Sequence, residues 1–147
     1  MVHHHQEQDD AGGIELPKPL ARYGIVELSS GVIKLPGQGC RDPETDECAG
    51  LTRDPSGSVV SYDIAAQTRG VFDNIERLLG TIGLDRSHLV DVTVFMRDKA
   101  DFAAMNAVWN DFFRDCEPPA RTTVFVVDLP AENYIEMKAE ASREARV

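Results

Sequence analysis

Residues 118–138 have the sequence PPARTTVFVVDLPAENYIEMK. Two apolar runs separated by a proline-containing segment predict a pair of strands joined by a turn. Arg121 lies where the first strand begins, and Glu136 lies in the middle of the second. A strand that buries its side chains rarely carries a charge unless that charge has a partner or a task. These two residues are therefore the first candidates for a functional site.

Side chains alternate between the two faces of a strand, so Arg121 and Thr123 share one face, as do Tyr134, Glu136 and Lys138. The opposite face of the second strand is apolar. Two hypotheses stay open. The first is a cross-strand salt bridge at a sheet edge. The second is a site in which the Arg121 guanidinium binds a carboxylate while Glu136 positions or deprotonates a water.

Upstream, the spacing of apolar residues alternates between the period of a strand and that of a helix. Asp63 is placed to cap a first helix, and Gly83 to end it in a left-handed conformation. Asp98 or Asp101 begins a second helix, which a pair of prolines stops. This order predicts an α+β (α/β mixed) fold with two helices on one face of a mixed sheet. The expected elements are a β-hairpin (23–28 and 32–35), a long loop (37–58), one undecided strand, a helix (64–82), a strand (88–96), a helix (101–115) and the two closing strands.

The chain of 147 residues has the length of one domain, which we expect to span residues 17–147. Residues 1–16 are polar, charged and glycine-bearing, which predicts a disordered tail, and we assign no function to its run of histidines. No apolar run approaches the roughly 20 residues that span a bilayer, and the N-terminus has no secretory apolar segment. We therefore expect a cytoplasmic protein with no membrane partner.

The formal charge of −10 argues against nucleic acid as a partner, because binding it needs a cationic surface. The three cysteines have no metal-ligand spacing and are expected to be reduced thiols. The sequence has no glycine-rich phosphate loop after a strand and no CxxC, HExxH or GxSxG motif. His88, at the start of a predicted strand, is interpreted as structural. We therefore expect no metal, no cofactor and no serine-hydrolase chemistry.

Other polar residues have both a structural and a functional interpretation. Asn106 lies on the second predicted helix, as an exposed polar residue or as part of a pocket wall. Arg22, Arg41 and Arg53 are either solvated loop charges or the rim of a site for an anion. Gly37 begins a Gly-Gln-Gly sequence after a strand, and a tight turn is a simpler explanation for it than backbone amides that bind an anion.

A family resemblance connects these segments. The closing sequence PARTTVFVVDLPAENYIEMKA resembles that of the RidA (YjgF-type) family of enamine/imine deaminases. The resemblance continues through DIAAQTRGVFDNIERLLGTIGLDRSHLVDVTVFMRDKADFAAMNAVWNDFF and, more weakly, through residues 23–38. It implies a chorismate-mutase-like mixed sheet with two helices packed on one face, and a homotrimer with sites in the clefts between subunits.

The resemblance also implies a role for individual residues. Arg121 matches the family arginine that holds the substrate carboxylate. Glu136 matches the glutamate that orients the attacking water or relays its proton. Tyr23 and Asn106 match residues that line the pocket. Thr123 stands where many members have a cysteine, which implies an altered pocket for small imino acids.

Within the family, the sequence PARTTV, the long loop at residues 43–62 and the helix start DIAAQTR resemble the 2-aminomuconate deaminase branch. This implies a hydrolytic deaminase, without metal or cofactor, that converts 2-aminomuconate to 4-oxalocrotonate and ammonia in aromatic-compound catabolism. The substrate is a dicarboxylate, so we expect one of the three loop arginines named above to bind its distal carboxylate. Two alternatives remain: a generalist deaminase of 2-imino and enamine acids, and a non-catalytic ligand-binding trimer.

Overall fold

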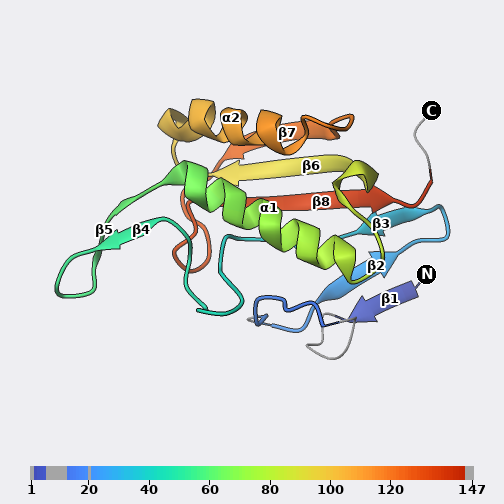
Figure 1. The fold of residues 1–147 in the computed structure, drawn as a ribbon, viewed down its shortest axis with the longest axis horizontal. Coiled ribbons are helices and arrows are strands. Elements are labelled where there is room, and N and C mark those ends of the chain that lie inside the picture. Colours follow the sequence, from blue (N-terminus) through green and yellow to red (C-terminus); the bar gives the residue numbers. More distant parts are fainter. Residues whose placement is uncertain (1, 6–12, 20, 145–147) are drawn as a thin grey trace.

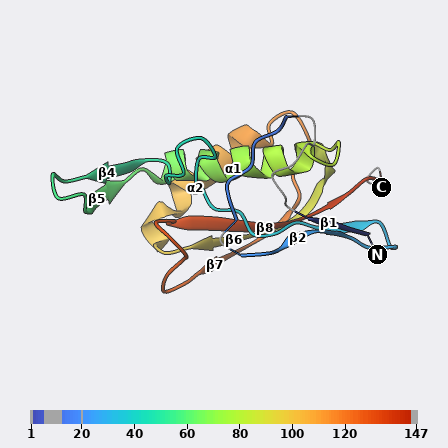
Figure 2. The same ribbon diagram turned by 90° about the horizontal axis from the view of Figure 1, so that it is seen from below.

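Two α-helices cover one face of a six-stranded mixed sheet in residues 2–5, 13–19 and 21–144, which a computed structural model describes (Figure 1; Figure 2). The α+β fold expected from the sequence, with both helices on one face, is confirmed. The helices are α1 (Ile64–Gly80) and α2 (Phe102–Phe112). In spatial order, the sheet contains β1 (Val2–His5), β2 (Gly24–Glu27), β3 (Val32–Lys34), β8 (Ile135–Ser142), β6 (Leu89–Met96) and β7 (Ala120–Phe125).

Strand β6 separates the two closing strands. It pairs in parallel with β7, which places Val92 opposite Arg121, and antiparallel with β8, which places Phe95 opposite Glu136. The predicted pairing of the closing strands with each other is therefore wrong. The apolar composition of β6 explains this, because a strand whose inner face lies in the core is shielded best between two neighbours. The connection over residues 126–134 passes the end of β6 to reach β8.

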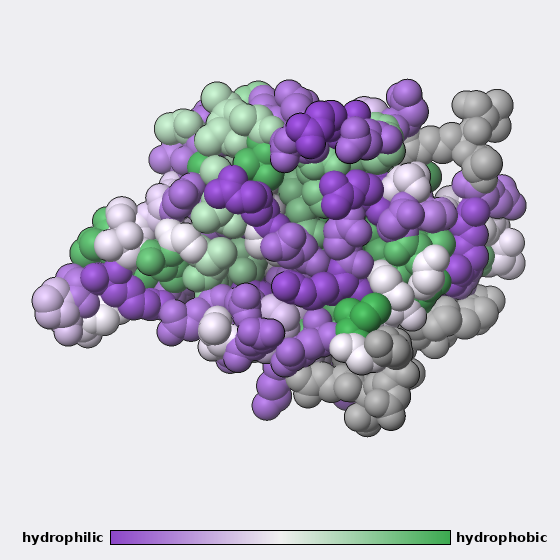
Figure 3. Space-filling view, viewed as in Figure 1, coloured by the Kyte–Doolittle hydropathy of each residue, from purple (hydrophilic) through white to green (hydrophobic). Residues whose placement is uncertain are grey.

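The predicted caps are confirmed at Asp63 and Asp98, whereas α1 ends at Gly80, before the left-handed Gly83, and Asp101 forms no side-chain cap bond. The Asp63 side chain accepts a hydrogen bond from the backbone N–H three residues later at 3.1 Å, and Gly83 has a φ of +73°. The Asp98 side chain caps a short 3₁₀ turn, Lys99–Asp101, that leads into α2. The ring of Phe72 stacks on that of Phe112 at 3.9 Å between centroids and joins the two helices. Hydrophilic residues cover much of the surface in Figure 3, viewed from the same side as Figure 1.

The loop expected over residues 37–58 contains a strand that the sequence did not reveal. Strand β4 (Leu51–Arg53) pairs with β5 (Val59–Tyr62) in a separate hairpin that projects from the body of the molecule (Figure 1). An ion pair of 2.7 Å between Arg53 and Glu132 ties the hairpin to the connection before β8.

The N-terminal segment also differs in part from its prediction as a tail. Residues 2–5 form β1, which pairs antiparallel with β2, and Leu16 is buried in the core. The rest of the predicted tail includes residues 1 and 6–12, which lie outside the described residues. No helix in the described part of the chain is long and apolar enough to cross a bilayer.

Gln67 fixes the start of β8 against α1. Its side chain is fully buried, its Nε2 donates to the Glu132 carbonyl at 3.1 Å, and its Oε1 accepts from the Tyr134 N–H at 2.8 Å. One amide thus satisfies both a donor and an acceptor of an irregular segment, as buried backbone groups require.

We expect the substitution Gln67→Met to lower the free energy of unfolding by about 2–4 kcal/mol, because two buried backbone groups lose their partners while the side-chain volume is kept. Chemical denaturation measures this change. The matched control is Arg69→Met on the exposed side of the same helix, which should change stability by no more than about 0.5 kcal/mol. Equal effects of the two substitutions would contradict the assignment.

Candidate functional site

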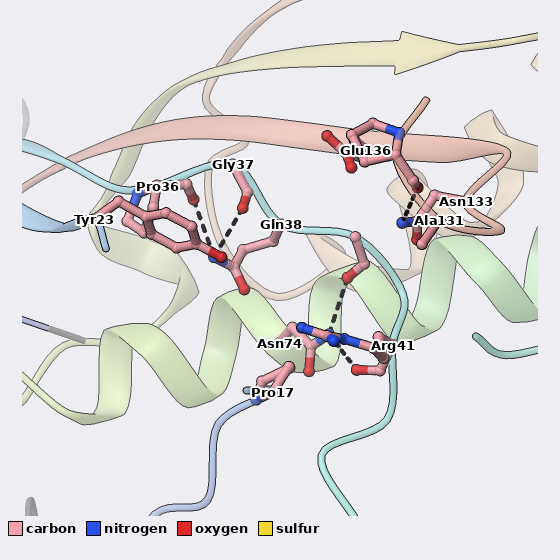
Figure 4. A pocket seen from close by; sticks show the side chains of 12 residues that line it. Pro17, Tyr23, Pro36, Gly37, Gln38, Arg41, Asn74, Ala131, Asn133 and Glu136 are labelled. Atoms are coloured by element: carbon pink, nitrogen blue, oxygen red, sulfur yellow. Dashed lines mark hydrogen bonds between the residues drawn. The ribbon is translucent and has the colours of Figure 1, made fainter. Parts of the chain in front are cut away.

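A cavity of about 490 Å³ lies beside the start of β8. Its walls come from the segment after β3, the connection before β8, and α1 (Figure 4). Four of the predicted site residues line it together: Tyr23, Gly37, Arg41 and Glu136. The complete lining consists of Pro17, Tyr23, Pro36, Gly37, Gln38, Gly39, Arg41, Asn74, Pro130, Ala131, Asn133 and Glu136.

Glu136 is the carboxylate of this cavity. It projects from the face of β8 opposite to Ile135 and Met137, both of which are fully buried in the core. Desolvation by burial raises the pKa of Glu136 above its ordinary value. Its carboxylate has no hydrogen bond or ion pair within residues 13–19 and 21–144. A carboxyl group of raised pKa in a cavity can accept and return a proton, as general acid–base catalysis requires.

The wall formed by residues 36–41 is held first by Gln38. Its backbone N–H and C=O pair with those of Met137 on β8, at 2.8 and 2.9 Å. Its side-chain Nε2 donates to the carbonyls of Pro36 and Gly37, both at 3.1 Å. The wall is therefore attached to β8 by an isolated antiparallel bridge at Gln38, after the end of β3 at Lys34.

Two further buried amides, Asn74 and Asn133, hold the rest of this wall. Asn74 Nδ2 donates to the carbonyls of Gly39 and Arg41, both at 2.9 Å, and Asn133 Oδ1 accepts from the Cys40 N–H at 2.9 Å. Neither asparagine was among the residues predicted from the sequence. The available signal for Asn74 was its place inside the apolar stripe of a predicted helix, where a polar residue needs a buried partner.

The rim of the cavity offers groups for a polar or anionic ligand. Tyr23 is 42% exposed, and the Gly37 N–H has no hydrogen-bond acceptor among the described residues. The Arg41 guanidinium lies 3.1 Å from Asp46 and donates to the Lys18 carbonyl. A few convergent polar groups around a largely preformed hollow are typical of a small-molecule site.

Arg121 lies elsewhere, against α2. Its Nη1 is 3.8 Å from Met105 Sδ, and its guanidinium carbon is 4.8 Å from the centroid of the Trp109 ring. Desolvation lowers the pKa of Arg121, and no acidic side chain in the described part of the chain forms an ion pair with it. Thr123 follows on the same face of β7, with its Oγ1 buried and without a hydrogen-bond partner among those residues. Asn106, half-buried, lies on α2 next to Met105.

Arg121 and Glu136 project from opposite faces of the sheet. Arg121 pairs with Val92, and Glu136 pairs with Phe95. Val92 and Phe95 are three residues apart on β6, so their side chains point to opposite faces, and paired residues share a face. The hypothesis of a cross-strand salt bridge is therefore wrong. A site shared by the two residues within one chain is also excluded by this register.

Arg22 and Arg53 do not line the cavity. Arg22 is exposed, and Arg53 donates to the Gly57 carbonyl at 3.0 Å within the hairpin besides its ion pair with Glu132. Of the three loop arginines, only Arg41 lies at the cavity. No group of three or more metal-ligating side chains is found within the described residues.

The chain is similar to known proteins in both sequence and fold. The family described as Endoribonuclease L-PSP matches residues 14–143. This chain is a member of the Endoribonuclease L-PSP family. A RutC family protein from Pyrococcus abyssi is 37% identical to it over 128 residues, which cover 87% of this chain and 91% of the relative. The 2-iminobutanoate/2-iminopropanoate deaminase of Escherichia coli is 38% identical over 91 residues, which cover 60% and 71%.

The solved structures agree with membership of the Endoribonuclease L-PSP family. The YjgF gene product of E. coli superposes with a TM-score of 0.76 at 31% identity, covering 92% of this chain and 99% of that one. The predicted resemblance to RidA (YjgF-type) proteins is thus confirmed for family and fold. One of the two sequence relatives bears a general RutC name and the other the name of an imino-acid deaminase, so the 2-aminomuconate branch stays a prediction.

We expect Glu136→Gln to raise the melting temperature at neutral pH by about 2 °C. The pKa of Glu136 is higher in the folded state than the ordinary value of 4.5, so ionisation above that value destabilises the fold relative to a neutral amide. The gain should vanish below about pH 4, where the carboxyl is protonated in both states, rise as the pH increases through the ordinary pKa, and level off above the folded-state pKa. Thermal melts across this range, with the exposed Glu144→Gln as control, test the sign. A variant that melts below the wild type at about pH 8 would contradict the desolvation.

Proposed function

We propose that this chain is a cofactor-free hydrolytic deaminase of enamine and imine acids, with 2-aminomuconate as its preferred substrate. The observation that carries the proposal is the desolvated Glu136 carboxylate, which lines the cavity without a partner among the described residues. A pocket that only binds a ligand gains nothing from such a group, because unpaired burial of a charge costs stability. The imino-acid deaminase of E. coli supports the same reaction class.

The reaction needs a held water and proton transfers, without a redox step. The enamine becomes an imine when carbon gains a proton and nitrogen loses one. Water then attacks the imine carbon, a C–O bond forms, and the C=N electron pair moves to the nitrogen, which takes up a proton. The hydroxyl proton then moves to the nitrogen, an electron pair of the oxygen forms the C=O bond, and the C–N bond breaks, so that ammonia leaves and the 2-oxo acid remains. Glu136 orients the water and carries its proton to the nitrogen, a role worth about 10²–10⁴-fold in rate.

The substrate carboxylate beside the amine needs a cation, and Arg121 matches the family arginine for this role. Because Arg121 and Glu136 lie on opposite faces of one sheet, we infer that Glu136 of one protomer and Arg121 of its neighbour complete each site. Arg121 lies on the edge strand β7 without an acidic partner among the described residues, and the apolar Phe102 and Phe125 near it are 37% and 38% exposed. This supports a homotrimer with sites in its clefts, to which Thr123 and Asn106 contribute from the Arg121 side.

The second carboxylate of 2-aminomuconate needs a second cation within the cavity. Arg41 meets this requirement, since it lines the cavity with Glu136 and its present partners are an exposed aspartate and a backbone carbonyl. Its guanidinium can exchange Asp46 for a substrate carboxylate, because the Asp46 side chain is 68% exposed and water can solvate it when it is released.

Other functions have less support. RNA cleavage, which the family's description names, conflicts with the charge of −10 and with a cavity that carries an unpaired carboxylate among the described residues, because both repel phosphate. A generalist imine deaminase would use the same Glu136 without needing Arg41. A ligand-binding trimer without activity would need neither proton transfer nor a carboxylate in the cavity.

If each site lies between two protomers, mixing two inactive variants should restore deaminase activity. Arg121→Ala and Glu136→Gln are each expected to lower deaminase turnover by at least about 100-fold. Mixed assemblies, formed by co-expression or by unfolding and refolding together, should recover about a quarter of the wild-type turnover, because random mixing leaves that share of sites with both intact residues. Ammonia release measures the turnover.

The control for this experiment is the double variant Arg121→Ala/Glu136→Gln mixed with wild type in equal amounts. It should also leave about a quarter of the sites intact, so it calibrates the expected recovery. If the two single variants stay inactive when mixed while this control is active, the site does not span two protomers.

Arg41→Ala is expected to raise KM for 2-aminomuconate by about tenfold or more, because a charge-assisted bond to the distal carboxylate is lost. KM for 2-iminopropanoate, which has one carboxylate, should change by less than about twofold. Arg22→Ala, which removes an exposed arginine outside the cavity, is the matched control. An equal rise in KM for both substrates would show that Arg41 does not bind the second carboxylate.

A further inference from the structure

Two thiols meet at one side chain beside the cavity. Cys40 Sγ lies 3.2 Å from Asn133 Oδ1, and Cys48 Sγ lies 3.6 Å from the same oxygen. Arg41, the neighbour of Cys40, forms an isolated antiparallel bridge with Cys48. Residues 40–48 therefore make a closed loop with a thiol at each end.

The two thiols have different surroundings. Cys40 is fully buried, while Cys48 is partly exposed. A hydrogen bond from Cys40 lowers the pKa of Cys48 to about 7, and the positive charge of Arg41 contributes in the same direction. The same hydrogen bond, together with burial, raises the pKa of Cys40. Cys48 is therefore the more acidic and the more accessible of the two thiols, and Cys40 is the buried one.

We propose that Cys40 and Cys48 form a redox-sensitive pair that hydrogen peroxide converts to a disulfide, which alters the cavity wall at residues 36–41. The arrangement matches what a thiol switch needs: a partly exposed attacking sulfur, a resolving sulfur near it, and a short loop between them. The proposed deamination uses neither Cys40 nor Cys48, so the pair is a separate modification site.

The chemistry is balanced by one peroxide molecule. The Cys48 thiolate attacks one oxygen, the O–O bond breaks, and the departing hydroxide takes a proton to become water, which leaves a sulfenic acid on Cys48. The Cys40 sulfur loses its proton and attacks the Cys48 sulfur. The S–S bond forms, the S–O bond breaks, and a second water is released. The two thiols lose two electrons, which reduce the peroxide to two waters.

Disulfide formation must act on the cavity wall through Asn133. Oxidation removes the thiol donor at Asn133 Oδ1, the oxygen that also accepts from the Cys40 N–H. The backbone at Gly39 packs tightly against the Asn133 side chain, because a Cβ added at Gly39 would lie 2.5 Å from the same oxygen. A shift of Cys40 toward Cys48 therefore moves Gly39 and Arg41, both of which line the cavity.

Peptide mapping of the wild-type chain tests the modification. After peroxide treatment and alkylation of the remaining thiols, the digest should contain a Cys40–Cys48 linked peptide, with Cys116 alkylated and the mass of the intact chain lower by two hydrogen atoms. Dithiothreitol should reverse the change. Cys116→Ser should still form the link, and Cys48→Ser should not. A link that involves Cys116, or oxidation of Cys48 to a sulfinic acid without a disulfide, would overturn the proposal.

Hydrogen–deuterium exchange of the same samples tests the effect on the wall. Oxidation should change the exchange rates of the amides at residues 37–41 by about threefold or more, while those in the middle of α1 stay unchanged. The Cys48→Ser chain treated with peroxide should show no such change. A mapped disulfide with unaltered exchange at 37–41 would overturn the coupling to the cavity. Neither measurement uses deamination, so failure here is distinguishable from failure of the proposed function.

Discussion

Strand β6 is hydrogen-bonded on both sides, and its inward residues Val92, Val94 and Met96 are fully buried. This double pairing fixes the register of β7 and β8 at once. A slip by one residue would exchange the buried and open faces of a strand, so the core tolerates only the observed alignment. The alignment also turns Arg121 toward α2 and Glu136 toward the opposite face. The packing of the core thus places the side chains of Arg121 and Glu136 on opposite faces of the sheet.

The cavity depends on amide side chains as much as the core depends on β6. Irregular backbone beside a hollow cannot complete its hydrogen bonds within a sheet, so Gln38, Asn74 and Asn133 supply donors and acceptors instead. Asn133 accepts from a backbone amide and both thiols at a single oxygen. One residue therefore connects the shape of the cavity with the redox state of a neighbouring loop.

Local signals were enough to predict the helices, their caps, the first hairpin and the outward orientation of Glu136. The partner of β7 could not be predicted this way, since strands adjacent in sequence usually pair and only the packed sheet shows that β6 lies between them. The hairpin of β4 and β5 was hidden because its short strands lie among glycine, proline and charged residues. Asn74 and Asn133 were missed because nothing in the sequence indicates which backbone groups a folded loop leaves without partners.

Strand β7 forms an edge of the sheet and exposes Phe125 at 38% and, just beyond its end, Val127 at 97%. Its outer backbone groups offer a template on which another strand can add. A copy of the chain whose β7 edge is bare is therefore more prone to aggregate than one whose edge is covered by another strand. Any strand that covers β7 thus also protects the chain, and a copy left uncovered is a better substrate for chaperones and proteases.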